Sequence, residues 1–154
     1  MKTKACFPGS FDPFTKGHED LVNRALSLFD EVIIAVGVNT SKTSLFSNET
    51  RLEHIKSCFA TDRVKVVNFS GLTVDFCEAN GCTHIVRGLR DTKDFSYELP
   101  IALMNRSMAK IETAFLLPDP VLFPINSSIV REIYKSGGKI DEFVTNSHLL
   151  IKNI

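Results

Sequence analysis

The fold of this chain is decided by the stretch Phe7-Pro8-Gly9-Ser10-Phe11-Asp12-Pro13-Phe14-Thr15-Lys16-Gly17-His18. It follows a short apolar segment, residues 4–7, that is typical of a β-strand, and it leads into an amphipathic helix predicted to begin at Gly17 or His18. Where a strand turns into a helix, free backbone N–H groups and the positive end of the helix dipole point at one spot, which suits phosphate. A lone histidine there also fits a simple helix cap. Ser10 and Asp12 on the same turn add further hydrogen-bonding groups beside it, and they favour an anion site.

Composition limits what such a site can bind. The chain has 154 residues, 44% of them hydrophobic, which fits a single domain over residues 1–154 with a core of its own. Its 18 basic and 18 acidic residues balance to a formal charge of zero. We therefore expect neither nucleic acid nor a membrane surface as a partner, and phosphate binding must be local.

Cysteine usage and hydropathy indicate where the protein works. The four cysteines form no C-x-x-C pair and fall within predicted strands and helices, so buried free thiols are expected rather than disulfides or a metal site. The N-terminus has no apolar leader, and the longest apolar run, residues 32–38, is too short to span a bilayer. The sequence therefore predicts a soluble, cytoplasmic protein. The cysteines are Cys6, Cys58, Cys77 and Cys82.

Strand and helix patterns alternate along the chain. The run at residues 32–38 is almost entirely apolar, as expected for a parallel strand that helices cover on both faces. Pro100 lies within a helical pattern over residues 91–110 and should either begin a helix or kink one. The tail, residues 141–154, is expected to form one or two short helices. The predicted strands are 4–7, 32–38, 64–69, 83–86 and 113–117, and the other predicted helices are 48–59, 72–80 and 127–135.

This alternation predicts an α/β fold with a doubly wound, five-stranded parallel sheet of Rossmann-like type. Ligands of such sheets bind beyond the carboxyl ends of the strands, where the opening stretch, residues 7–18 and here called the phosphate turn, and three further polar clusters fall. Taken singly, each cluster also fits a solvated charge or a helix cap. Together they predict a phosphate-binding cleft. The three clusters are Lys42, Arg87-Gly88-Leu89-Arg90 and Asn126-Ser127-Ser128.

The motifs narrow the chemistry of this cleft. The chain lacks G-x-x-x-x-G-K-[ST], which speaks against a P-loop kinase or ATPase, and it lacks the G-x-G-x-x-G fingerprint of dinucleotide enzymes. It has no nucleophile elbow either. Fixed cations without a covalent nucleophile fit direct phosphoryl or nucleotidyl transfer, in which the protein positions the phosphates and stabilises their charge.

The opening stretch resembles the nucleotidyltransferase superfamily, whose T/H-x-G-H turn binds nucleotide phosphates. Four further motifs resemble bacterial phosphopantetheine adenylyltransferases, over nearly the whole chain. This resemblance implies transfer of AMP from ATP to 4'-phosphopantetheine, which yields dephospho-coenzyme A and pyrophosphate, with Mg²⁺ as cofactor and a homohexamer as the assembly. The motifs are Arg87-Gly88-Leu89-Arg90, Asp94-Phe95-x-Tyr97-Glu98, Met104-Asn105-Arg106 and Ser127-Ser128-x-Val130-x-Glu132.

The resemblance also implies roles for single residues. It assigns catalysis to His18, Lys42 and Arg90, and it assigns contacts with phosphopantetheine to Ser10, Lys42, Thr73 and Arg87. Asn126 departs from the family, in which a serine is common, but asparagine also caps a helix well. The implied ATP contacts are Ser10, Phe11, Gly17, His18, Gly88, Leu89, Arg90, Glu98, Leu122, Phe123, Pro124, Ile125, Asn126, Ser127 and Ser128.

Two other functions stay open from the sequence. A nicotinate-mononucleotide adenylyltransferase shares the T/H-x-G-H turn, although the segments around Arg87–Arg90 and Tyr97-Glu98 fit it poorly. The chain could also be a non-catalytic nucleotide-binding module, against which the intact His18, Lys42 and Arg90 argue.

Overall fold

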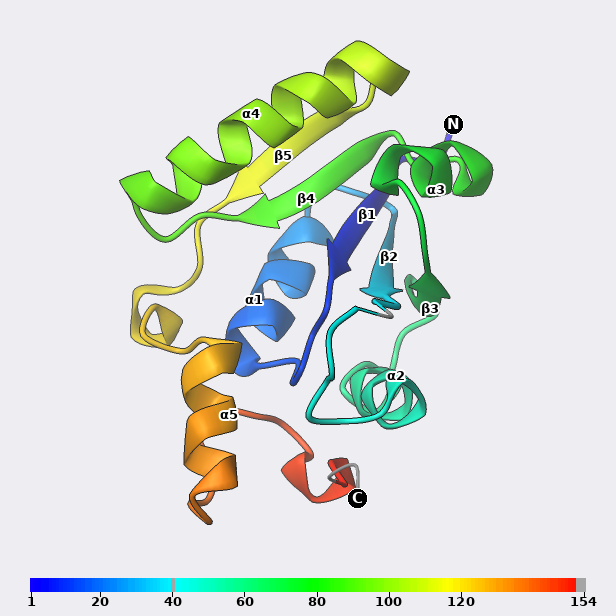
Figure 1. Ribbon diagram of the computed structural model, residues 1–154. Coiled ribbons are helices and arrows are strands. Elements are labelled where there is room, and N and C mark those ends of the chain that lie inside the picture. Colours follow the sequence, from blue (N-terminus) through cyan, green and yellow to red (C-terminus); the bar gives the residue numbers. More distant parts are fainter. Residues whose placement is uncertain (40, 152–154) are drawn as a thin grey trace.

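The computed structural model describes residues 1–39 and 41–151, and at its centre lies a sheet of five parallel strands (Figure 1). The strands lie in the order β3-β2-β1-β4-β5. Because the chain crosses from one edge of the sheet to the middle after β3, the strand order reverses between β1 and β4, which is where such sheets bind ligands. The predicted five-stranded, doubly wound α/β fold is therefore confirmed. The strands are β1 (Lys4–Gly9), β2 (Glu31–Gly37), β3 (Val64–Phe69), β4 (His84–Gly88) and β5 (Glu112–Leu116).

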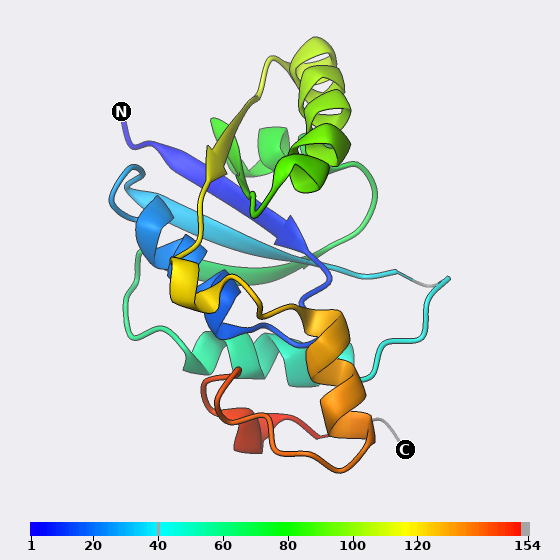
Figure 2. The same cartoon turned by 90° about the vertical axis from the view of Figure 1, so that its left-hand side faces the viewer.

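Alternate residues of the strands build two cores, one on each face of the sheet. Phe7 and Ile34 belong to the core under α1 and α2, and the neighbouring Cys6 and Ile33 belong to the core under α3. Figure 2 shows α1 and α2 on one side of the sheet and α3 and α4 on the other. Both faces are thus covered, which explains the continuous apolar runs in the central strands. The helices are α1 (Lys16–Ala25), α2 (Asn48–Ser57), α3 (Thr73–Asn80) and α4 (Thr92–Ala109).

A third core joins the C-terminal segments to the carboxyl edge of the sheet. It holds Phe46, Val130 and Val144, so it brings the loop after β2, helix α5 (Ser127–Lys135) and the tail together. The tail also binds the start of α1, where the Lys16 N–H donates to the Phe143 carbonyl over 2.9 Å. Helix α5 therefore lies beside the phosphate turn (Figure 2).

Several element boundaries differ from the sequence predictions. Helix α1 begins at Lys16, because Thr15 caps it, and α4 continues through Pro100, so the proline does not begin that helix. The described part of the tail contains one short 3-10 helix, Ser147–Leu149, and residues 152–154 of the predicted tail lie outside the described residues. None of the helices in the two described ranges has the length and apolarity needed to cross a membrane.

Candidate active site

The turn from β1 to α1 is held in place by side chains from distant elements. The Asp12 carboxylate accepts the N–H groups of Leu45 over 2.8 Å and Phe46 over 3.0 Å, which ties the loop after β2 to the turn. The Arg87 guanidinium donates to the Pro8 carbonyl and the Arg131 guanidinium to the Asp12 carbonyl, each over 2.8 Å. With strands β1 and β4 side by side, these contacts make the turn a rigid wall rather than a free loop.

His18 is presented by the first turn of α1 in a defined protonation state. Its Nδ1 accepts the Thr15 N–H over 3.0 Å, while the Thr15 hydroxyl accepts the His18 N–H, so histidine replaces the usual Glu or Gln of a capping box. Burial and the nearby charges of Arg87 and Arg90 lower the pKa of His18 to about 4. The neutral ring therefore carries its proton on Nε2 and offers that nitrogen as a hydrogen-bond donor.

A cavity of about 410 Å³ opens at the carboxyl ends of β1 and β4. The phosphate turn forms one wall, the end of β4 and the start of α4 form another, and the segment leading into α5 closes it. The start of α5 is fixed there because the Ser127 hydroxyl donates to the Pro13 carbonyl over 2.9 Å. The predicted site residues in its lining are Ser10, Phe11, Gly17, His18, Arg87, Gly88, Arg90, Glu98, Leu122, Ile125, Asn126 and Ser127.

A second cavity, of about 810 Å³, lies on the other side of the same wall. It extends from Ser10 past the ends of β2 and β3 to Thr73 at the start of α3, with α4 along its far side. Three predicted site residues, Ser10, Arg87 and Glu98, line both cavities. The site is therefore a pair of pockets that meet at one boundary, each large enough for part of a ligand.

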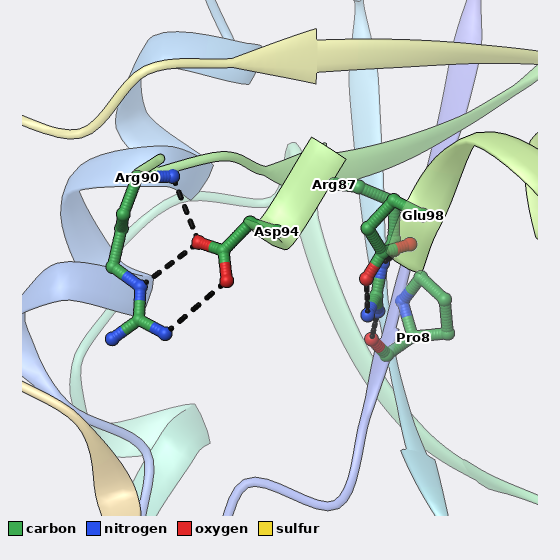
Figure 3. Close-up of polar contacts among 5 residues, drawn as sticks. All are labelled: Pro8, Arg87, Arg90, Asp94 and Glu98. Carbon is green, nitrogen blue, oxygen red and sulfur yellow. Dashed lines mark hydrogen bonds and ion pairs between the residues drawn. The ribbon is translucent and has the colours of Figure 1, made fainter. Parts of the chain in front are cut away.

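Two arginines of the site, Arg87 at this boundary and Arg90 in the first cavity, are held by acidic residues of α4 (Figure 3). Arg87 makes a bidentate pair with Glu98, with its Nε 3.0 Å and its Nη2 2.5 Å from the two carboxylate oxygens. Arg90 pairs through its Nε with Asp94 over 3.1 Å, and its backbone N–H donates to the same carboxylate oxygen. Although partial burial raises the pKa of Asp94, these bonds from Arg90 lower it below its usual value. Because Asp94 and Glu98 are four residues apart, they project from the same face of α4.

Some predicted site residues lie outside the lining of both cavities. Lys42 is exposed on the loop after β2, and the ends of this loop are tied to the site, by Asn39 in the second cavity and by the bonds of Leu45 and Phe46 to Asp12. The others belong to segments that do contribute to the first cavity. They are Leu89, Phe123, Pro124 and Ser128.

The cavities also contain polar residues that sequence reasoning did not assign. Asp94, Tyr97 and Arg131 line the first cavity, and Tyr97 lines the second as well. Arg131 also donates to the Ser128 hydroxyl over 3.1 Å. The sequence did contain a signal for Arg131, which lies one turn after the start of α5. Side chains one turn apart share a face of a helix, so a residue there often faces the ligand that the helix N-terminus binds.

Comparison with known proteins shows which sequences this chain is similar to. A cytidylyltransferase-like family model matches residues 6–133. A phosphopantetheine adenylyltransferase of Leptospira biflexa is 48% identical over 146 residues, which cover 94% of this chain and 91% of that protein. One of Porphyromonas gingivalis is 45% identical over 150 residues, which cover 97% of this chain and 98% of that protein.

A solved structure agrees in fold. It is a bifunctional NMN adenylyltransferase/ADP ribose pyrophosphatase from Francisella tularensis, complexed with AMP and a manganese ion. It superposes with a TM-score of 0.68 at 19% identity, covering 97% of this chain and 48% of that one. This chain therefore spans about half of that protein, and the likeness supports the nucleotidyltransferase fold alone.

Proposed function

Because this chain belongs to the phosphopantetheine adenylyltransferases of the cytidylyltransferase-like family, we propose that it transfers the adenylyl group of ATP to 4'-phosphopantetheine. The products are dephospho-coenzyme A and pyrophosphate. The observation that carries the proposal is the pair of cavities that meet at Ser10, Arg87 and Glu98, since the reaction joins two phosphate-bearing substrates at one point. ATP occupies the first cavity, which the starts of α1 and α5 face, and phosphopantetheine occupies the second.

The reaction needs little covalent chemistry from the protein. A phosphate oxygen of phosphopantetheine attacks the α-phosphorus of ATP in line, a new P–O bond forms, and the bond to the bridging oxygen breaks so that pyrophosphate leaves with the electron pair. Because a phosphate monoester is already largely ionised at pH 7, no general base is required. Catalysis then rests on alignment and on stabilisation of charge at the α-phosphate, for which we propose the Nε2–H of His18 and the cations of Arg90 and Lys42.

Arg87 is suited to orient the acceptor phosphate. A guanidinium has five N–H donors. Among the described residues, Glu98 and Pro8 accept from three of those of Arg87, so two remain for a ligand. Glu98 fixes the plane of that guanidinium while Ser10 lines the same boundary. We propose that Lys42 supplies a further charge from the loop after β2, whose two ends adjoin the site.

We further propose that Mg²⁺ accompanies ATP. The described residues contain no cluster of three His, Cys, Asp or Glu side chains placed to hold a metal ion. This fits an ion bound mainly by phosphate oxygens and water, which is the usual way of binding Mg²⁺ at nucleotide sites. Bound there, it would neutralise phosphate charge, while the residues named above align the two substrates.

The wider setting of the enzyme is also part of the proposal. We propose a homohexamer of single-domain chains, supported by the exposed apolar side chains of α4, of which Leu103 is 55% and Met104 60% exposed. We also propose a cytoplasmic location, which the four free cysteines support.

An acceptor assay tests the proposed reaction. Pyrophosphate release from MgATP is measured with 4'-phosphopantetheine, with nicotinate mononucleotide and with unphosphorylated pantetheine, a matched control that lacks the attacking phosphate. We expect release with 4'-phosphopantetheine only. Release with nicotinate mononucleotide alone would establish the rival enzyme, and ATP binding without release on any acceptor would indicate a non-catalytic module.

A further inference from the structure

Arg51 lies behind the phosphate turn and outside the lining of both cavities. It stands near the start of α2, is 4% exposed, and donates through Nη1 to the carbonyl oxygen of Ser10. Its Nε is buried without a partner in the part of the chain that the structure describes. None of the ion pairs among the described residues includes Arg51.

The stability of the fold does not account for this arginine. Burial lowers the pKa of Arg51, although the charges of Asp12 and Glu49 raise it in part. A buried guanidinium that lacks a close carboxylate loses its hydration without full compensation, and apolar side chains of similar volume often stabilise a core as well or better. Its contact with Ser10 therefore calls for another explanation.

That contact fixes the direction of one backbone N–H group. The Ser10 carbonyl and the Phe11 N–H belong to the same planar trans peptide group, so they point in opposite directions. Phe11 has a φ of +50°, in the left-handed region that is costly for a residue with a side chain. A hydrogen bond to the carbonyl also polarises the peptide group and strengthens its N–H as a donor.

We propose that Arg51 is a positioning residue, which binds the Ser10 carbonyl and thereby aims the Phe11 N–H at the phosphate being transferred. Ser10 and Phe11 line the first cavity together with His18, so this N–H adds a fixed donor beside the imidazole. The kinetic part of the proposal rests on the proposed adenylyl transfer. The structural part, a backbone donor set by Arg51, depends only on phosphate binding in this cavity.

Three variants test the kinetic part. Arg51→Met removes the contact, Arg51→Lys keeps a charge with a simpler donor, and Arg63→Met is the matched control. Arg63 also donates to backbone carbonyls, those of Leu26, Phe29 and Asp30, but it lies outside both cavities.

The expected results separate positioning from stability. Arg51→Met should lower kcat about a hundredfold, the usual effect of a small misplacement of catalytic groups, with a smaller change in the KM for ATP. Arg51→Lys should recover part of that kcat, and Arg63→Met should lower the melting temperature while keeping kcat. A normal kcat in Arg51→Met, or an equal loss of kcat in Arg63→Met, would overturn the proposal. If Arg51→Met does not fold, Arg51→Leu takes its place, and a kcat equal to that of the unmodified protein in that variant would overturn the proposal.

The structural part has a readout that does not depend on turnover. The amide resonance of Phe11 is followed by ¹⁵N NMR while MgATP is added. We expect a shift in the unmodified protein and in Arg63→Met that is lost in Arg51→Met. A shift retained in Arg51→Met, or absent from the unmodified protein, would overturn the proposal. Absence of pyrophosphate release from the unmodified protein would instead count against the proposed function, and the amide shifts would still decide the role of Arg51.

Discussion

His18 shows how neighbouring groups set the chemistry of one side chain. Its ring stacks on Phe14 with ring centroids 5.4 Å apart and meets Phe11 edge-on with ring centroids 5.1 Å apart. The Thr15 N–H donates a hydrogen bond to its Nδ1. These contacts fix the ring plane, the tautomer and the neutral state together. We therefore expect His18 to stabilise the transferred phosphate as a hydrogen-bond donor rather than as a cation.

Replacing His18 by alanine should lower kcat by about a hundredfold to a thousandfold, the usual effect of losing one donor to a transition-state oxyanion. Pyrophosphate release under saturating substrates measures it, and thermal unfolding shows whether the fold is kept. His148→Ala is the control, because that histidine is exposed and outside both cavities. Near-normal turnover in His18→Ala would contradict the assignment.

Stability should depend on pH through the same residue. The His18 pKa is lowered from 6.5 to about 4 in the folded protein, so at intermediate pH the unfolded chain binds a proton that the folded protein does not. Above pH 6.5 the free energy of unfolding is therefore at its full value with respect to His18. It decreases as the pH falls from 6.5 toward 4, because protons then favour the unfolded chain. Urea unfolding at several pH values should show this loss, and His18→Gln should remove part of it. An NMR titration of the ring with a midpoint near 6.5 would contradict the prediction.

At the scale of elements, strand β4 packs on helix α1 through Gly88 and Leu21. A Cβ atom added at Gly88 would lie 2.4 Å from the Leu21 Cδ1, in the buried core beneath the sheet. A side chain at position 88 would therefore require the Leu21 side chain to move. The packing of β4 on α1 brings Arg87 and Arg90 alongside the start of α1, where His18 lies.

Gly88→Ala should therefore lower the free energy of unfolding by about 1–3 kcal/mol, as overpacking of a tight core commonly does. Leu21→Val in the same chain should recover part of this loss, because valine has no Cδ atoms. Urea denaturation of the single and double variants measures both effects. Equal stabilities of the single and double variants would show that the clash is relieved in another way.

The sequence predicted the strands and the common edge of the site, because apolar runs and strand ends are local signals. It placed His18 and Arg90 at one edge correctly, since parallel strands end at the same side of a sheet. The contact between Arg51 and Ser10 joins residues 41 positions apart, and the pairing of Arg87 with Glu98 depends on how α4 packs. Lys42 lies on a loop whose path no periodic pattern encodes. Such side-chain contacts depend on tertiary packing, which local patterns do not determine.

At the scale of the whole molecule, α4 is the least covered of the five α-helices in the described ranges. Glu98 is its only buried residue among 18, while its exposed apolar side chains include Ile101, Leu103, Met104 and Met108. The face that carries Glu98 and Asp94 meets the active site, and another side of the helix packs on α3 and β5. The exposed apolar side chains such as Leu103 and Met108 remain available for contacts between copies. We therefore expect α4 to contribute to the proposed assembly.

Leu103→Glu should weaken that assembly, because a carboxylate in an apolar interface loses its hydration. Sedimentation velocity at several protein concentrations should show smaller species than in the unmodified protein. Lys139→Glu, a charge change at an exposed position after α5, is the control and should leave the mass unchanged. A Leu103→Glu protein of unchanged mass would place the contacts elsewhere.

The boundary at Ser10, Arg87 and Glu98, where the two cavities meet, affects the release of the product. A molecule that spans both cavities loses its translational freedom once, whereas two separate substrates lose it twice. Under the proposed function, dephospho-coenzyme A is such a molecule, since it would place the adenylyl group in one cavity and the pantetheine arm in the other. It should therefore bind more tightly than either half. Bisubstrate ligands built on its pyrophosphate linkage should bind tightly for the same reason.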